Sequence, residues 1–271
     1  MIFKDRTVRT NIVLFLLIFI ILISVTVGNN LRNKQNTKKE EPNLSIKTES
    51  NIFKLDSITL YSSANAINNS DDQSKWNLNI YQYTDISIKL DNMVSMEELT
   101  NKNTVKKLYI DNIKFPSEPS LGKPSLYYKD PNKFGIATVN DEYLIKNSLN
   151  YKIITKNEDI DYSSPIYYTD CSNPITLSYI NKDVVPDFTV ENTDSTIIFD
   201  GSLLRDSSVL LSTISSTVSF TIHIVNYLDE EFTCDVVFEI PLEDNLKDIY
   251  SGSYTKELTK FHSNKFYKIG E

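Results

Sequence analysis

Apolar and polar residues alternate most regularly between residues 76 and 90. Six of the eight even positions in this stretch are apolar, whereas most odd positions are polar. A period of two residues predicts a β-strand with one buried face. The polar pair Gln82 and Thr84 interrupts the apolar face, so we expect a bulge or a bend at this point, or a strand that crosses between two sheets.

The same alternation returns near the C-terminus. Val218–Tyr227 and Phe232–Ile240 each present apolar residues at every second position, and Leu228–Glu231 between them predicts a hairpin. Shorter candidate strands lie at Ser57–Tyr61, Leu108–Phe115, Ser125–Lys129, Tyr151–Thr155, Ile166–Thr169, Ile175–Ile180, Phe188–Glu191 and Thr196–Phe199. About ten strands separated by turn residues predict an all-β fold, namely one large β-sandwich or two smaller ones divided near residues 157–164.

Signals for helices are few in this part of the chain. Ser95 and Glu98 have the spacing of a capping box and predict a short helix that ends near Asn103. A stripe of apolar residues from Leu203 to Ile214 predicts a second short helix, although an extended conformation fits the many Ser and Thr residues equally well. We therefore expect one or two short helices beside the strands.

The N-terminus has a different pattern. Every residue from Ile12 to Ile23 is apolar, and basic residues lie on both sides of the apolar run, which ends at Gly28. A run of this kind predicts a transmembrane anchor at residues 12–28, with residues 1–11 in the cytoplasm. A cleaved signal peptide and a buried soluble helix remain as alternatives, but the sequence around Gly28 matches a cleavage site poorly.

Residues 29–51 are polar, of mixed charge and without apolar periodicity, which predicts a disordered linker. Residues 52–271 would then form an extracytoplasmic β domain at the end of this tether. The abundance of Asn, Tyr and Thr fits a domain that faces outward. These features together predict a single-pass protein of a bacterial cell membrane, with the lipid bilayer as its partner through residues 12–28.

The charge and the motifs of the sequence argue against several classes of function for this chain. A net charge of −8 argues against a nucleic acid as partner, because such domains are usually basic. The sequence has no Gly-x-Ser-x-Gly elbow and no His-Glu-x-x-His motif, which disfavours serine hydrolases and zinc proteases. A glycan hydrolase needs only two carboxylates, so 36 acidic residues leave that class open. No cofactor is expected.

The two cysteines favour a structural role. Cys234 shares the apolar face of its predicted strand, whereas His223 lies on the opposite face of its own, so a Cys-His nucleophile is not expected. In an oxidising envelope Cys171 and Cys234 could form a disulfide. The alternative is a pair of buried thiols that act as small apolar groups.

Two sets of side chains are candidates for binding a ligand, one for a calcium ion and one for a sugar. Asp159 and Asp161 would project to the same side of an extended segment and could contribute to a calcium site, whereas Asp130-Pro131-Asn132 is better explained as an ordinary turn. Tyr81 and Tyr83 occupy the polar face of the strand at 76–90. An outward pair of tyrosine rings could stack on sugars, but packing against a second sheet, or the ordinary preference of tyrosine for strands, explains such residues better.

These patterns predict a membrane-anchored bacterial cell-surface protein whose β domain is non-catalytic and serves a structural or ligand-binding role. Its partner would be cell-wall glycan or another envelope protein. Two alternatives stay open. One is an envelope glycan hydrolase that uses paired carboxylates. The other is a self-assembling matrix or fibre subunit, in which exposed strand edges pair between copies.

Overall fold

The computed structural model describes residues 47–72, 74–93, 100–137, 139–154, 166–171, 173–191, 197–241, 252–260 and 265–270. Contacts group Lys47–Glu271 into one compact unit. Within the described ranges, no helix has the length and apolar character needed to cross a bilayer. The predicted anchor at 12–28 and most of the predicted linker lie outside the described residues.

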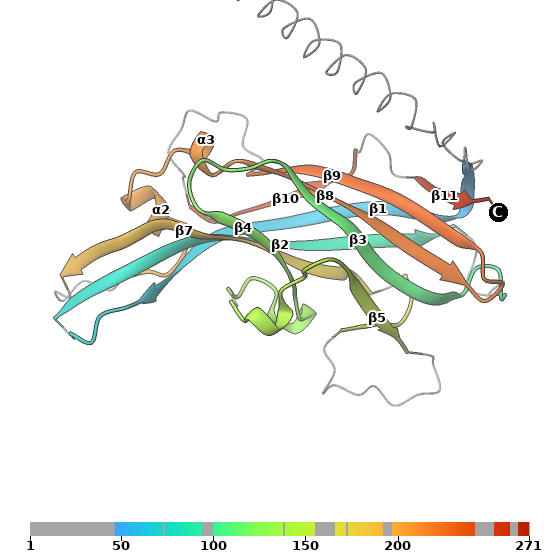
Figure 1. Ribbon diagram of the computed structural model, residues 1–271, viewed down its shortest axis with the longest axis horizontal. Coiled ribbons are helices and arrows are strands. Elements are labelled where there is room, and N and C mark those ends of the chain that lie inside the picture. The colour runs from blue at the N-terminus through green and yellow to red at the C-terminus, as the bar shows by residue number, and fades with distance from the viewer. Residues whose placement is uncertain are drawn as a thin grey trace, which may run out of the picture. The chain divides into compact units, whose positions relative to one another are not determined.

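The described part is built from strands, which confirms the prediction of a mainly β fold (Figure 1). The strands are β1 (Lys47–Asn68), β2 (Lys75–Asn92), β3 (Val105–Ser117), β4 (Lys123–Tyr128), β5 (Leu149–Ile153), β6 (Tyr167–Tyr168), β7 (Ile175–Glu191), β8 (Ser216–Asn226), β9 (Glu231–Ile240), β10 (Tyr254–Leu258) and β11 (Lys265–Ile269). Two α-helices, α2 (Ser202–Asp206) and α3 (Leu211–Ile214), follow β7, where the sequence predicted one apolar stripe.

The strands form one eleven-stranded sheet, in which ten follow the order β4-β7-β2-β1-β11-β9-β8-β3-β5-β6 and β10 pairs with β1 off this path. Strand β1 pairs with β2 along one edge, and with β11 and then β10 along the other. All pairs are antiparallel except β5 with β6. The sheet curls, so strands from the two ends of this order pack on a shared core. Because hydrogen bonds link all of the strands, two separate sheets are not established here.

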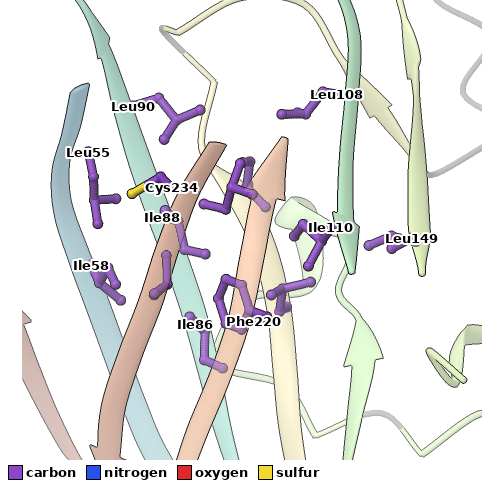
Figure 2. Close-up of a cluster of buried hydrophobic side chains, with 14 of the residues drawn as sticks. Leu55, Ile58, Ile86, Ile88, Leu90, Leu108, Ile110, Leu149, Phe220 and Cys234 are labelled. Carbon is purple, nitrogen blue, oxygen red and sulfur yellow. The ribbon is translucent and has the colours of Figure 1, made fainter. Parts of the chain in front are cut away.

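The main core lies between β1, β2 and β7 on one side and β3, β8 and β9 on the other (Figure 2). It contains Leu55, Ile58, Ile86, Ile88, Ile110, Phe220 and Cys234, all with 2% or less of their surface exposed. Ile86 and Ile88 occupy alternate positions of β2, as the sequence pattern predicted, whereas Leu55 and Ile58 are separated by a bulge in β1. Burial of such side chains contributes about 1.5–3 kcal/mol each to folding.

A second core covers the far halves of the long strands. Ala64 of β1, Leu78 and Ile80 of β2 and Val184 of β7 pack against Leu204 of α2 and its neighbours. The two short helices thus replace the strands β3, β8 and β9 as the covering layer at this end of the sheet. This arrangement explains why β1, β2 and β7 are so much longer than the other strands.

Strand β2 contains the whole stretch that was predicted from its alternation, and β8 and β9 form the predicted hairpin. The predicted irregularity near Gln82 also occurs, but the extra residues are in the partner. Between Ile80 and Gln82, β7 runs from Val185 to Asn181. Asp183 in this bulge has a φ of 57°, a conformation that Asp tolerates better than most residues.

Four other predictions differ from the structure or fall on residues outside the described ranges. The segments at Ile175–Ile180 and Phe188–Glu191 are parts of the single strand β7. Residues 197–199 are not in a strand, and Thr196 lies outside the described residues. The capping box at Ser95–Glu98 lies outside them as well, while residues 101–103 form a turn. Strand β1 begins at Lys47, inside the range predicted as linker.

Candidate functional site

The outer face of β2 is covered rather than open. Tyr81 and Tyr83 are only 7% and 4% exposed, so the predicted outward pair of rings is not what the structure shows. They pack with Tyr127 of β4 and Ile180 of β7, beneath the segment between β4 and β5 that includes Leu144. We call residues 129–147 the cover segment. Because it closes this face, the two rings are unavailable as a stacking surface for sugar.

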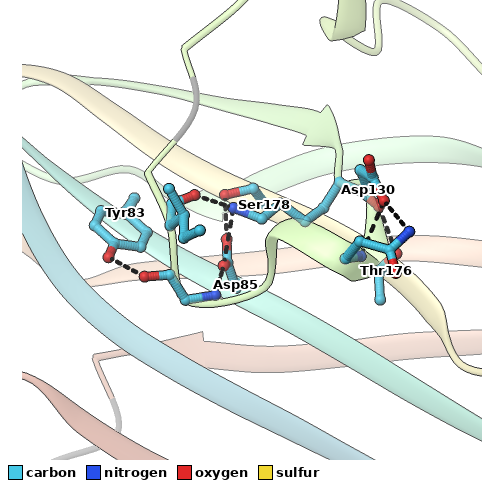
Figure 3. Close-up of polar contacts among 9 residues, drawn as sticks. Tyr83, Asp85, Asp130, Thr176 and Ser178 are labelled. Atoms are coloured by element: carbon cyan, nitrogen blue, oxygen red, sulfur yellow. Dashed lines mark hydrogen bonds and ion pairs between the residues drawn. The ribbon is translucent and has the colours of Figure 1, made fainter. Parts of the chain in front are cut away.

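A buried ion pair lies beside the two tyrosines (Figure 3). Lys129 Nζ is 3.0 Å from Asp85 Oδ2, and the two side chains are 1% and 0% exposed. The Ser178 hydroxyl donates to Asp85 Oδ1 at 2.8 Å, and the backbone N–H of Gly135 donates to Oδ2 at 2.7 Å. The ammonium of Lys129 also donates to the carbonyl of Ile136. Each charged group is therefore held by several partners.

Strand register explains how these residues meet. Asp85 lies directly opposite Ser178, and Ser178 lies opposite Tyr127, so one row crosses β2, β7 and β4. Lys129 follows Tyr127 by two positions, which puts both side chains on the same face. Its side chain therefore reaches over β7 to the carboxylate on β2.

The turn at the start of the cover segment completes the site. The side chain of Asp130 accepts a hydrogen bond from the N–H of Asn132, which confirms the predicted Asp-Pro-Asn turn. Gly135 has a φ of 80°, a conformation that favours glycine. Its N–H points to Asp85, and its carbonyl oxygen accepts from the Tyr83 hydroxyl at 3.0 Å. The turn thus fixes the cover segment to the sheet.

Burial shifts the pKa values of both Asp85 and Lys129. Desolvation raises the pKa of the Asp85 carboxyl, against the opposing effects of Lys129 and Ser178. Desolvation likewise lowers the pKa of Lys129, although Asp85 opposes this shift. Both groups are therefore displaced towards their neutral forms, because a low-dielectric interior disfavours charge.

A second polar cluster lies on the outer face of β3, β8 and β9. His223 Nδ1 is 2.7 Å from Glu231 Oε1, and His223 Nε2 is 2.8 Å from Asp111 Oδ1. Tyr109 stacks on the imidazole at 4.2 Å between ring centroids and donates its hydroxyl to Glu231. An imidazole donates to two ionised carboxylates only when both of its nitrogens carry protons. This geometry therefore suits a cation held between two anions.

The cluster around His223 is expected to stabilise the fold less in acid than at neutral pH. Burial raises the pKa of Glu231, but the hydrogen bonds from Tyr109 and His223 outweigh it, so that pKa is lowered overall. A carboxylate with a lowered pKa stabilises the fold above its unfolded-state pKa, and this contribution is lost as the pH falls through the folded-state value. Because 34% of the side chain is exposed, solvent screens the effect to about 1 kcal/mol or less.

We therefore expect Glu231→Gln to reduce the free energy of unfolding near neutral pH, and this reduction to shrink as the pH falls from about 4 through the lowered pKa of Glu231. Urea unfolding of both proteins across this pH range measures the difference. Glu257→Gln, a matched change at an exposed carboxylate of β10, serves as the control. A difference for Glu231→Gln that stays constant from neutral to acid pH would contradict the assignment.

A groove opens beside the far end of β7. Its volume is about 480 Å³, and it lies between the end of that strand and α2. Its lining combines apolar and polar residues, namely Phe188, Thr189, Val190, Glu191, Ile197, Ile198, Ser202, Leu203, Arg205 and Asp206. Close by, Phe199 is partly exposed and its ring lies 6.2 Å from that of Trp76. The sequence pattern did not identify this groove, because its two walls come from separate segments.

The remaining predicted site residues are not brought together. Cys234 is buried in the main core and Cys171 is half-buried, and both have free thiols. His223 lies on the face opposite Cys234, as expected from the alternation. Asp159 and Asp161 lie outside the described residues. Among the residues that are described, no group of three or more His, Cys, Asp or Glu side chains has the arrangement of a metal site.

Comparison of the chain with protein-family models, with curated proteins and with solved structures found no match.

Proposed function

We propose that this chain is a membrane-anchored protein of the bacterial cell surface whose non-catalytic β domain, packed as a sandwich-like curled sheet, binds cell-wall glycan in the groove beside β7. The groove is the observation that carries this proposal. Its volume lies within the range of small-ligand sites, and it combines apolar walls with a few polar groups, as such sites do.

The lining of the groove suits a sugar. The ring of Phe188 offers an apolar surface for the C–H face of a pyranose. Glu191, Arg205 and Asp206 supply acceptors and donors for hydroxyl groups, and Arg205 Nε is already held 3.1 Å from Asp206 Oδ1. The covered tyrosines on the other face do not offer this combination.

Binding to purified cell-wall glycan fragments tests the groove. We expect Phe188→Ala to weaken binding by about 5- to 30-fold, since it removes an apolar contact worth about 1–2 kcal/mol. Glu191→Gln is expected to weaken it less, and Glu257→Gln, at an exposed carboxylate of β10 outside the groove lining, is the matched control. Isothermal titration calorimetry measures all three. Equal affinities for the wild type and Phe188→Ala would exclude this groove as the glycan site.

A glycan hydrolase is the second candidate, because Glu191 and Asp206 line the same groove. A pair of carboxylates is the minimum that hydrolysis requires. The two functions differ in the fate of the ligand. A binding module leaves the glycan intact, whereas an enzyme releases new reducing ends that Glu191→Gln or Asp206→Asn would abolish.

Part of β7 has no neighbouring strand on one side among the described residues, and this edge is where a fibre subunit, the third alternative, would pair with another copy. Strand β4 pairs with β7 only as far as Lys182. Beyond that point β7 has Pro186, which lacks an N–H, and two residues of positive φ, Asp183 and Asp187. Proline and bulges are features that protect strand edges from pairing with other chains. This edge therefore favours a monomeric module over strand-to-strand assembly.

The location of the β domain is tested on intact cells. If residues 12–28 anchor the chain with its C-terminus outside, protease added to intact cells is expected to remove residues 47–271 from the membrane fraction. A cytoplasmic protein followed in the same samples is the control for lysis. An antibody against the β domain detects the loss on a blot. A domain that is degraded only after the cells are broken would place it inside.

A further inference from the structure

We propose that Lys129 and Asp85 join through an intramolecular amide bond between the Lys129 amine and the Asp85 carboxyl. The structure holds the two groups in contact, with 3.0 Å between Nζ and Oδ2. Neither side chain is more than 1% exposed. The proposal concerns a covalent modification of this chain by itself, with no second protein or cofactor.

The reaction balances within the pair. The Lys129 ammonium first transfers a proton to Asp85 Oδ2, which leaves a neutral amine beside a neutral carboxylic acid. The amine nitrogen then forms a bond to Cγ, and the Cγ–Oδ2 bond breaks. Oδ2 leaves as water with the proton that it received and a second proton from the amine. No oxidant or reductant takes part.

The surrounding donors suit this reaction. The Ser178 hydroxyl donates to Asp85 Oδ1 at 2.8 Å, where negative charge develops when the amine adds to Cγ. The N–H of Gly135 donates to Oδ2 at 2.7 Å and orients the oxygen that leaves. The carbonyl of Ile136 accepts from Nζ and fixes the position of the amine. Figure 3 shows Ser178 beside Asp85.

Burial favours both the reaction and its product. In water, an amine and a carboxylic acid ionise, and neither charged form reacts. Here desolvation moves the pKa of Asp85 up and that of Lys129 down, towards the neutral pair that reacts. Holding two groups in contact gives effective concentrations of up to about 10⁵–10⁸ M. The amide also removes two buried charges, and the cover segment keeps out the water needed to reverse the reaction.

The bond would tie three strands together. Asp85 is on β2, and Lys129 directly follows β4, while β7 lies between them. The edge strand and the first residue of the cover segment would therefore stay attached to the middle of the sheet even when the hydrogen bonds break. Such a link suits a domain that must resist unfolding outside the cell.

Mass spectrometry of a tryptic digest of the purified, unfolded full chain tests the proposal. Trypsin cuts after Lys75 and Lys89, and after Lys114 and Lys133, but not at a lysine that carries an amide. We expect peptides 76–89 and 115–133 to appear joined, at the sum of their masses less that of one water, about 18 Da. Free peptide 76–89, together with cleavage after Lys129, would overturn the proposal.

Two lysine variants test whether the joined peptide comes from an amide bond at Lys129 and not from nonspecific crosslinking. Lys129→Met is expected to abolish the joined peptide. Lys182→Met removes a lysine that has the same 3.0 Å contact with Asp141, but in an exposed pair, and it is expected to leave the joined peptide unchanged. If Lys129→Met fails to fold, the wild-type digest alone decides the question. A joined peptide that involves Lys182 and Asp141 would show that contact, rather than burial, drives the reaction, and would overturn the proposal.

Discussion

Lys129→Met is expected to lower the free energy of unfolding by about 3–5 kcal/mol, because it leaves the Asp85 carboxylate buried without its counter-charge. Ser178 and Gly135 would still donate hydrogen bonds to Asp85, but neither carries a charge. The cover segment would also lose the contact between Lys129 and Ile136. Unfolding in urea, followed by tyrosine fluorescence, measures the change.

Two further variants sharpen this test. The double change Lys129→Met with Asp85→Leu is expected to recover the part of this loss that comes from the unpaired buried carboxylate, since apolar replacements of a buried pair are often neutral or stabilising. It would not recover the part that comes from loss of the proposed amide bond. Lys182→Met, in the exposed pair with Asp141, is expected to cost less than about 1 kcal/mol. A similarly small loss for Lys129→Met would mean that the buried pair does not hold the cover segment in place.

Phe220→Ala is expected to destabilise the fold by about 3–5 kcal/mol, through lost burial and the cavity left behind. Phe220 is 2% exposed and lies in the main core between the two ends of the curled sheet (Figure 2). Its ring packs edge-on against that of Phe238, at 6.2 Å between centroids. The truncation therefore removes this ring contact together with the burial of Phe220 in the main core.

Val237→Ala provides the matched control for Phe220→Ala. Val237 lies on β9 beside the residue that pairs with Phe220, but it faces outward and is 58% exposed. We expect its truncation to change the free energy of unfolding by no more than about 0.5 kcal/mol. Thermal unfolding of both variants makes the comparison. Equal losses would mean that the two faces of β9 are not buried as the structure describes.

Much of the fold was predictable because alternation is a local signal. Strand β2 and the β8–β9 hairpin follow directly from apolar residues at every second position. The position of Cys234 on the buried face and of His223 on the opposite face follows from the same rule. One face of a strand becomes buried whatever its partners are, so a single stretch of sequence suffices to predict it.

The candidate site was less predictable, although one signal was present. Tyr81 and Tyr83 precede Asp85 on the face of β2 that alternation marks as polar. Two large rings on such a face indicate a second covering layer, an explanation that the sequence left open beside the outward pair. If a second layer covers this face, Asp85 is buried as well, and a buried carboxylate needs a partner. Nothing near Asp85 in the chain identifies Lys129 as that partner.

By itself, the sequence determined that the chain is rich in strands, where most of them lie and which face of each is apolar. Only the tertiary structure decided that β4 pairs with β7, that the cover segment closes the outer face, and that Lys129 therefore meets Asp85. The reason is that alternation records whether a side chain is buried but not what buries it. The groove beside β7 depends in the same way on where α2 packs, which is set by contacts between residues far apart in the chain.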